Sequence, residues 1–262
     1  MRPYPGPVHD LTPDMPPAAA QPEPMFRTQP VSFVRRSGRL TASQQRAWDE
    51  RRDAYLVEVP RAVARTSVDP AWRFDAEAVF GRRAPLVVEI GSGQGENVVE
   101  AADAHPERDH LAVEVYVPGL AQTIVRAGQR RDRQGLANLR LVQANAAELL
   151  ATSLPESSID ELWVFFPDPW HKARHHKRRL VTPRFAELAA RVLRPGGTWR
   201  LATDWAEYGE QMLEVAEASP AFRNAHGAGA RAPRFAGRVL TSFERKGLAA
   251  GRSVTDLEYV RV

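Results

Sequence analysis

The sequence predicts an α/β fold in which helices cover both faces of a doubly wound, mostly parallel β-sheet. From residue 85 onward, short β-branched runs alternate with helical segments, which is the pattern of a parallel sheet with crossover helices. The first run ends in a glycine-rich turn that leads directly into a helix. The last run, residues 256–260, follows a segment with the turn-forming residues Gly and Pro. It is expected to complete the sheet with an antiparallel pair.

Five parallel strands are predicted, at residues 86–90, 110–115, 139–143, 159–165 and 198–203. The helices expected with them are 97–105, 118–130, 146–150, 183–193 and 206–218. Ahead of the sheet, a helical pattern follows Thr41 and runs through Trp48 and Tyr55, which predicts an appended helix. We interpret its aromatic residues as packing contacts, whereas the arginines that precede it are freer to meet a phosphate.

Composition divides the chain into three segments. Residues 1–30 hold nine of the 21 prolines and few large apolar side chains. Such a composition cannot bury enough surface to offset chain entropy, so a disordered tail is predicted. Residues 31–84 form an N-terminal extension that carries the appended helix. Residues 85–262 form the domain that contains the sheet.

The bulk composition excludes several classes of protein. The chain has 43% hydrophobic and 26% charged residues, and its apolar stretches are broken within about ten residues, short of the roughly 20 that cross a bilayer, so no membrane association is expected. The absence of cysteine rules out disulfides and thiolate metal sites. Because the N-terminus has no secretory apolar segment, we predict a cytoplasmic protein. We also expect a monomer, since no apolar surface stripe is obvious.

A candidate ligand site follows the first strand, in the turn that contains Gly91, Gly93 and Gly95. Glycine lets a backbone approach a ligand closely, and the following helix offers unpaired N–H groups at its N-terminus. The spacing is G-x-G-x-G, whereas the dinucleotide fingerprint is G-x-G-x-x-G, so a nicotinamide-dependent enzyme fits less well. Such turns also arise for packing reasons, and the glycines alone do not choose between the two.

Polar residues at the ends of the next two strands favour a nucleoside-like ligand. Glu114 ends the second strand, at the edge where open α/β sheets bind ligands, and its carboxylate could accept two ribose hydroxyls. The alternative is a buried carboxylate satisfied by a salt bridge. Asn145 follows the third strand, where its amide could bond an adenine edge; it could equally be the N-cap of the next helix.

The fourth strand runs into the segment F-F-P-D-P-W at residues 165–170. The two prolines fix a non-helical turn and remove backbone donors. Asp168, which lies between them, is therefore expected at the carboxyl edge of the sheet, beside the ligand cleft. A carboxylate in that place is the candidate catalytic group.

A basic run follows at residues 171–179, with five Lys or Arg and three His in a chain whose formal net charge is only +4. A solvated helix start is the ordinary explanation of such a run. Its position beside a ligand pocket favours contact with the phosphates of a polymer whose base enters the pocket, with Trp170 as a stacking surface. His171 and His175 could share a helix face around a metal, but no third ligand completes a site, so no metal is predicted.

The residues of the ligand site resemble class I methyltransferases, which use S-adenosylmethionine. That resemblance rests on four features of the site. They are an acid before the glycine turn (Glu89), the turn itself (Gly91 and Gly93), an acid at the end of strand two (Glu114) and a polar residue after strand three (Asn145). It implies a seven-stranded, Rossmann-like sheet and S-adenosylmethionine as the cofactor, with Glu89 facing the amino group of the methionine part.

Residues 165–179 are similar to the signature of bacterial tRNA (guanine-N7-)-methyltransferases, F-F-P-D-P-W-x-K-x-R-H-x-K-R-R. The A-T-D-W at 202–205, the T-S-F-E-R at 241–245 and the F-V-R-R-S-G-R-L-T at 33–41 resemble further motifs of that family. The resemblance covers the chain from about residue 31 to its end. It implies methyl transfer to N7 of a guanine in the tRNA variable loop (position 46), with tRNA as the partner and no protein partner required.

The family's roles carry over to matching positions of this sequence. Asp168 is implied as the catalytic residue, and the cofactor is expected to contact Glu89, Gly91, Gly93, Glu114, Asn145 and Asp168. The substrate guanosine is expected to contact Lys172, Asp204, Thr241, Ser242, Phe243 and Glu244. Ser242 departs from the family pattern, which usually has Lys there, and Arg245 or Lys246 could compensate. Asn145, where many relatives have Asp, keeps the ability to hydrogen-bond.

The expected chemistry needs little acid–base catalysis. Guanine N7 has an in-plane lone pair, so positioning should dominate, and Asp168 is expected to orient the base and stabilise its developing positive charge. One alternative is a class I methyltransferase with another RNA, protein or small-molecule acceptor, which leaves the basic run and Trp170 without a role. Another is a non-catalytic RNA-binding protein, which the intact Glu89, glycines, Glu114 and Asp168 argue against.

Overall fold

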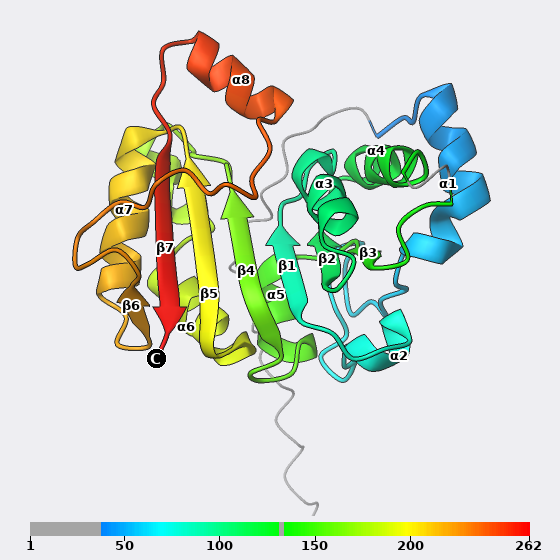
Figure 1. Cartoon of the computed structure of the whole chain (residues 1–262), viewed down its shortest axis with the longest axis horizontal. Coiled ribbons are helices and arrows are strands. Elements are labelled where there is room, and N and C mark those ends of the chain that lie inside the picture. Colours follow the sequence, from blue (N-terminus) through cyan, green and yellow to red (C-terminus); the bar gives the residue numbers. More distant parts are fainter. Residues whose placement is uncertain (1–37, 131–133) are drawn as a thin grey trace, which may run out of the picture. The chain divides into compact units, whose positions relative to one another are not determined.

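A seven-stranded sheet crosses the centre of the computed structural model, which describes residues 38–130 and 134–262 (Figure 1). Its order is β3-β2-β1-β4-β5-β7-β6. The strands are β1 Leu86–Ile90, β2 Asp109–Val113, β3 Leu139–Val142, β4 Ile159–Phe165, β5 Leu193–Thr203, β6 Phe222–Asn224 and β7 Thr255–Arg261. Strands β1 to β5 pair in parallel, and β7 runs antiparallel to β5 and β6. The predicted doubly wound fold is confirmed.

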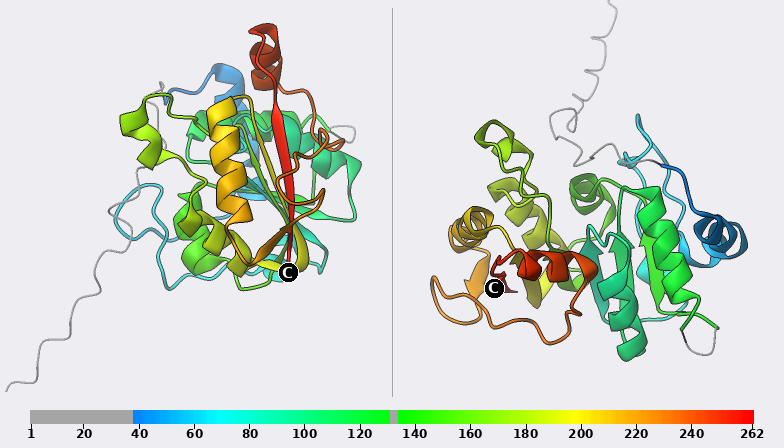
Figure 2. Two further views of the ribbon diagram at one scale, coloured as in Figure 1. Left: turned by 90° about the vertical axis from the view of Figure 1, so that its left-hand side faces the viewer. Right: turned by 90° about the horizontal axis from the view of Figure 1, so that it is seen from above.

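Helices lie on both sides of this sheet, as the view from above shows (Figure 2). They are α1 Ala42–Tyr55, α2 Ala76–Phe80, α3 Glu96–Ala104, α4 Val117–Ala127, α5 Ala146–Glu148, α6 Pro183–Val192, α7 Ala206–Glu217 and α8 Ser242–Ala249. One core cluster joins α3 and α4 to β2 and β3 through residues such as Val98, Leu120 and Leu141. A second cluster joins α6 and α7 to the opposite face through Phe185, Trp199 and others, and a third, smaller one includes Val87 and Trp163. Both faces are therefore covered by apolar packing, as parallel sheets require.

The register brings the carboxyl ends of four strands to one edge. Ile90 pairs with Val113 on one side and with Val164 on the other, and Val113 pairs with Val142. The residues that follow β1, β2, β3 and β4 therefore emerge together. Because β1 lies between β2 and β4, this is also where the order of the strands reverses, the usual ligand position in open α/β sheets.

The appended helix is present as α1. It begins with a capping box, in which Gln44 N donates to the Thr41 hydroxyl and Thr41 N donates to the Gln44 side chain. At its other end the hydroxyl of buried Tyr55 accepts a hydrogen bond from Leu136 N at 3.0 Å. The expected packing role of its aromatic residues is thus observed for Tyr55. The predicted tail and Arg35 and Arg36 lie outside the described residues.

Several elements differ from the sequence-based prediction. Strand β5 begins at Leu193 rather than at 198, so α6 ends one residue earlier than expected. The short α2, β6 and α8 were not predicted, and the basic run forms a 3-10 helix, Ala173–Arg178. In the described part of the chain, no helix combines the length and the apolar character needed to span a bilayer.

Candidate functional site

The turn after β1 is built from glycines in the left-handed region. Gly91, Gly93 and Gly95 have φ values of 72°, 58° and 72°, which side-chain-bearing residues rarely adopt. A Cβ at Gly91 would meet no atom of the described residues within 4 Å, so they leave the space above this turn open. The neighbouring Ser92 hydroxyl is buried and has no hydrogen-bond partner among the described residues. The turn therefore offers both room and an unused polar group to a ligand.

The carboxylate of Glu114 ties the end of β2 to this turn. It accepts hydrogen bonds from the backbone N–H groups of Gly93 (2.9 Å), Val115 (2.7 Å) and Tyr116 (2.9 Å). Burial raises the pKa of Glu114, and the three N–H donors oppose that rise. None of the ion pairs found in the described ranges includes Glu114, so backbone donors take the place of the salt bridge that was the alternative.

Glu89 lies beneath the same turn and is almost completely buried. Its carboxylate accepts a hydrogen bond from Asn97 Nδ2 at 3.2 Å. Burial raises the pKa of Glu89 to about 8; the Asn97 bond opposes that rise, and the nearby charge of Glu114 adds to it. A buried acid with so little compensation is suited to meet a cationic group of a ligand.

Asn145 caps α5. Its Oδ1 accepts from Ala147 N at 3.0 Å and from Glu148 N at 3.3 Å. The N-cap alternative is therefore observed. Because Oδ1 is engaged in the cap, Nδ2 is the atom of Asn145 that would contact an adenine. That contact stays a prediction.

Asp168 lies just past the end of β4, between two strained aromatic residues. Phe166 and Trp170 have φ values of 52° and 48°, a conformation that costs bulky residues about 1–3 kcal/mol each. Asp168 itself is exposed. Burial is the main cause of the raised pKa of Glu114, and the negative charge of Asp168 adds to it. The two carboxylates therefore lie close enough to interact electrostatically. The structure thus brings the candidate catalytic acid to the glycine turn.

The basic run after this turn separates into a structural part and an exposed part. Arg179 is buried; its Nε donates to Pro169 O at 2.8 Å and its Nη1 donates to Gln211 at 2.7 Å. Arg179 therefore holds the Pro-Asp-Pro turn in place and is not free for phosphate, which corrects the interpretation of the whole run as an anion patch. Lys172 and the neighbouring Arg174 and Lys177 are exposed.

Trp170 already has partners within this run. The Arg178 guanidinium lies 4.9 Å from its ring centroid, and the His175 ring meets it edge-on at 5.8 Å. Among the described residues no group of three His, Cys, Asp or Glu could hold a metal ion.

The remaining predicted substrate residues lie at α8 and at the end of β5. Thr241 is the N-cap of α8, and Phe243 is half-exposed with its ring 5.6 Å from that of Phe166. Asp204 is buried and accepts from Arg252 Nε at 2.7 Å. In Figure 1, α8 lies at the end of the sheet toward which β1, β4 and β5 point.

Glu244 has a structural environment that the sequence did not indicate. Its carboxylate is buried and pairs with Arg234 and with fully buried Arg238, and Arg238 also pairs with Asp256 of β7. The Arg238 guanidinium also lies 5.2 Å from the ring of Phe166. This network fixes residues 238–244, the substrate-side segment, against β7 and the end of β4. The guanosine contact predicted for Glu244 stays a prediction.

Ser242 is held by the N-terminus of α3. Its N–H and hydroxyl both donate to Glu96, at 2.6 and 3.0 Å. The other carboxylate oxygen of Glu96 accepts from Arg126 at 3.2 Å. Where the family usually has Lys, this chain therefore has a serine that anchors the substrate-side segment. Arg245 and Lys246, which could compensate for the missing cation, are exposed.

Three residues that support the site were missed from the sequence: Glu96, Asn97 and Gly119. Asn97 is a buried polar residue in a helix whose other buried residues are Val and Ala, which was an available signal. Gly119 lies in the first turn of α4, where a Cβ would collide with the carbonyl oxygen of Gly93. A glycine inside a predicted helix was the only sign of this close approach.

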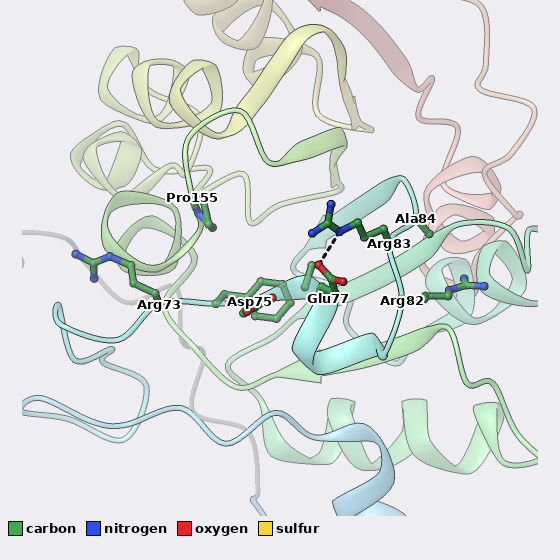
Figure 3. Close-up of a pocket in the computed structure, with 9 residues that line it drawn as sticks. Arg73, Asp75, Glu77, Arg82, Arg83, Ala84 and Pro155 are labelled. Carbon is green, nitrogen blue, oxygen red and sulfur yellow. Dashed lines mark hydrogen bonds and ion pairs between the residues drawn. The ribbon is translucent and has the colours of Figure 1, made fainter.

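A separate hollow of about 470 Å³ lies at the opposite edge of the sheet (Figure 3). Ala84, just before β1, and Pro155, before β4, line it, together with the ion pair between Arg83 and Glu77 at 2.6 Å. None of the predicted site residues contributes to this hollow.

Residues 83–257 match a family model described as a putative methyltransferase. The chain is 48% identical to the tRNA (guanine-N(7)-)-methyltransferase of Paenarthrobacter aurescens (strain TC1), over 95% of this chain and 98% of the relative. It is 48% identical to the protein of that name from Cutibacterium acnes (strain DSM 16379 / KPA171202), over 88% and 83%.

Among solved structures, the aminoglycoside resistance methyltransferase NpmB1 is similar, with a TM-score of 0.51 and 18% identity over 79% of this chain and 100% of that one. The 16S rRNA methyltransferase KamB has a TM-score of 0.51 and 20% identity, over 77% and 99%. These structural likenesses support the fold.

We predict that Gly119→Ala weakens binding of S-adenosylhomocysteine, because the added methyl group displaces Gly93 and the turn. Overpacking of this kind costs about 1–3 kcal/mol, so the dissociation constant measured by calorimetry should rise about tenfold. Gly128→Ala, at the other end of α4, is the control, since its methyl would come no closer than 3.1 Å to the flexible Arg51 side chain and 3.2 Å to the Ile124 carbonyl oxygen. Equal affinity of the two variants would contradict the proposed close approach.

We predict that Arg238→Ala destabilises the protein by about 3–5 kcal/mol, because it leaves buried Asp256 without its cation and buried Glu244 with only the half-exposed Arg234. Urea denaturation measures the change. Arg234→Ala removes a half-exposed partner of the same Glu244 and should cost less than about 1 kcal/mol. Equal losses of unfolding free energy in the two variants would show that the burial of Arg238 does not increase its contribution to stability.

Proposed function

The chain belongs to the tRNA (guanine-N(7)-)-methyltransferase family, and on this premise we propose that it methylates N7 of a guanine in the tRNA variable loop, at position 46. The methyl donor is S-adenosylmethionine. The proposal rests chiefly on the position of Asp168. It lies between Phe166 and Trp170, whose backbones are in the left-handed region, and close enough to Glu114 to interact electrostatically.

The residues around the glycine turn fit this cofactor. No described residue fills the space above Gly91 or bonds the buried Ser92 hydroxyl, and the buried Glu89 suits a cationic amino group. Glu114 would face the ribose hydroxyls and Asn145 the adenine. When bound, the cofactor supplies an electrophilic methyl group on a sulfonium.

Asp168 has a positioning and electrostatic task in this proposal. Guanine N7 attacks through its in-plane lone pair, so no proton has to be removed first. The purine gains positive charge during transfer, and a carboxylate fixed nearby stabilises that charge while it orients the base. The strained backbone at Phe166 and Trp170 holds the carboxylate in place before substrate binds.

The exposed part of the basic run would contact RNA. Lys172, Arg174 and Lys177 present cations beside the Asp168 turn, where phosphates of a bound strand would pass. N7 lies in the deep groove of an RNA helix, which side chains do not enter. The target is therefore a guanine in a loop, or one pulled out of its stack.

We further propose that the protein acts as a cytoplasmic monomer without a protein partner. Support comes from the complete set of candidate groups on one chain: Glu89, Glu114, Asp168 and the exposed cations all surround one edge of one sheet.

The direct test uses purified protein, labelled S-adenosylmethionine and unmodified tRNA, followed by digestion of the RNA to nucleosides. We expect the label in 7-methylguanosine. A tRNA in which the variable-loop guanine is replaced by adenine should accept no label. Label in another nucleoside, or none, would refute the proposed reaction.

Asp168→Ala should lower kcat by about 100-fold or more, in keeping with the loss of a preorganised charge-stabilising group. Binding of S-adenosylhomocysteine should change less than about threefold, because cofactor affinity depends mainly on the turn and on Glu114. Single-turnover kinetics and calorimetry measure the two effects. A near-normal rate in this variant would rule out the role given to Asp168.

Cofactor affinity should rise with pH through Glu89. Its pKa of about 8 in the free protein means that the carboxyl is mostly protonated at pH 6.5, and a cationic ligand must first displace that proton. The affinity for S-adenosylhomocysteine therefore increases up to about pH 8 and then levels off.

Glu89→Gln is the matched control for this pH dependence. The variant should bind more weakly and lose the rise, while the ligand's own amino group titrates identically in both proteins. Calorimetry from pH 6.5 to 9 gives the comparison. Parallel pH profiles for wild type and variant would mean that Glu89 does not titrate in this range.

A further inference from the structure

The side chain of Asn97 connects the two halves of the site. Its Nδ2 donates to Glu89 Oε2 at 3.2 Å, and its Oδ1 accepts from Val239 N at 3.2 Å. Asn97 is 3% exposed. One buried amide therefore bridges two described partners, Glu89 under the glycine turn and Val239 in the substrate-side segment.

This contact differs from the other anchor of the same segment. Ser242 is bound by Glu96, whose second oxygen pairs with Arg126 of α4, and no hydrogen bond in the described ranges joins Glu96 to Glu89. The Glu96 anchor holds Ser242 regardless of the charge on Glu89. The Asn97 anchor depends on Glu89 directly.

The strength of the Asn97 contact depends on the charge of Glu89. A carboxylate accepts a hydrogen bond from an amide roughly twice as strongly as a neutral carbonyl does. A cationic ligand beside Glu89 favours its ionised form. The ionised form holds Nδ2 toward Glu89, and the planar amide then keeps Oδ1 directed at Val239 N.

We propose that Asn97 is a positioning residue that couples occupancy of the cofactor site to docking of the substrate-side segment, so that cofactor and tRNA bind with positive cooperativity. The inference rests on the proposed function. It assigns Asn97 no contact with substrate. Its effect passes through Glu89 on one side and Val239 on the other.

The test measures the tRNA dissociation constant by fluorescence anisotropy, with and without saturating S-adenosylhomocysteine. In the wild type we expect the ligand to tighten tRNA binding by about fivefold or more, within the usual range of coupling between sites. In Asn97→Ala the ratio should fall below about twofold. Asn97→Asp keeps an acceptor for Val239 but, once its carboxyl is ionised, has no hydrogen to donate to Glu89, and it should lose the coupling as well.

Ser242→Ala is the control for a merely structural effect. It loosens the same segment through Glu96, so tRNA affinity should drop equally with and without the ligand and the ratio should stay at the wild-type value. A wild-type ratio near one, or a full ratio in both Asn97 variants, would overturn the inference.

Hydrogen exchange gives a second readout that needs no variant. S-adenosylhomocysteine should slow exchange of the Val239 amide in the wild type, because its acceptor is then fixed. Unchanged exchange would contradict the coupling. If the wild type neither binds nor methylates tRNA, the proposed function fails and this inference fails with it; normal methylation without coupling overturns the inference alone.

Discussion

The carboxylate of Glu114, surrounded by three backbone N–H groups, is the interaction on which the site depends. It joins the glycine turn after β1 to the end of β2, and the close approach of Gly119 to Gly93 is possible only while that turn keeps its shape. A largely desolvated carboxylate that lacks an ion-pair partner among the described residues is costly. Here backbone N–H donors offset that cost and hold the cofactor turn in its observed conformation.

The substrate side is organised by different means. The Asp168 turn is fixed by the left-handed backbone of Phe166 and Trp170 and by buried Arg179. The substrate-side segment is fixed against β7 by the ion pairs of Arg238 and Glu244. The strain at the turn is offset by the surrounding packing and ion pairs. Catalysis by positioning needs this kind of rigidity, because most of the gain comes from holding the reacting atoms together.

Much of this could be predicted from the sequence, because the strands and the turn are local features. The β-branched runs fixed β1 and β4 to the residue, and the placement of Glu114 and Asp168 at strand ends followed from the parallel fold. Long-range features could not be predicted in this way. Nothing local distinguishes buried Arg179 from exposed Lys177, and the ion pair between Arg238 and Asp256 depends on the return of β7 beside β5. The predicted roles of the remaining site residues stay predictions.

In the proposed reaction, the edge of the sheet that carries Asp168 presents guanine N7, and no other atom, to the methyl donor. The decisive experiment uses a tRNA with 7-deazaguanosine at position 46, because the base keeps its shape and its pairing edge but lacks the nucleophilic nitrogen. We expect this tRNA to bind about as tightly as unmodified tRNA and to compete with it, yet to accept no methyl group. Methyl transfer to the 7-deaza tRNA would show that an atom other than N7 is the acceptor.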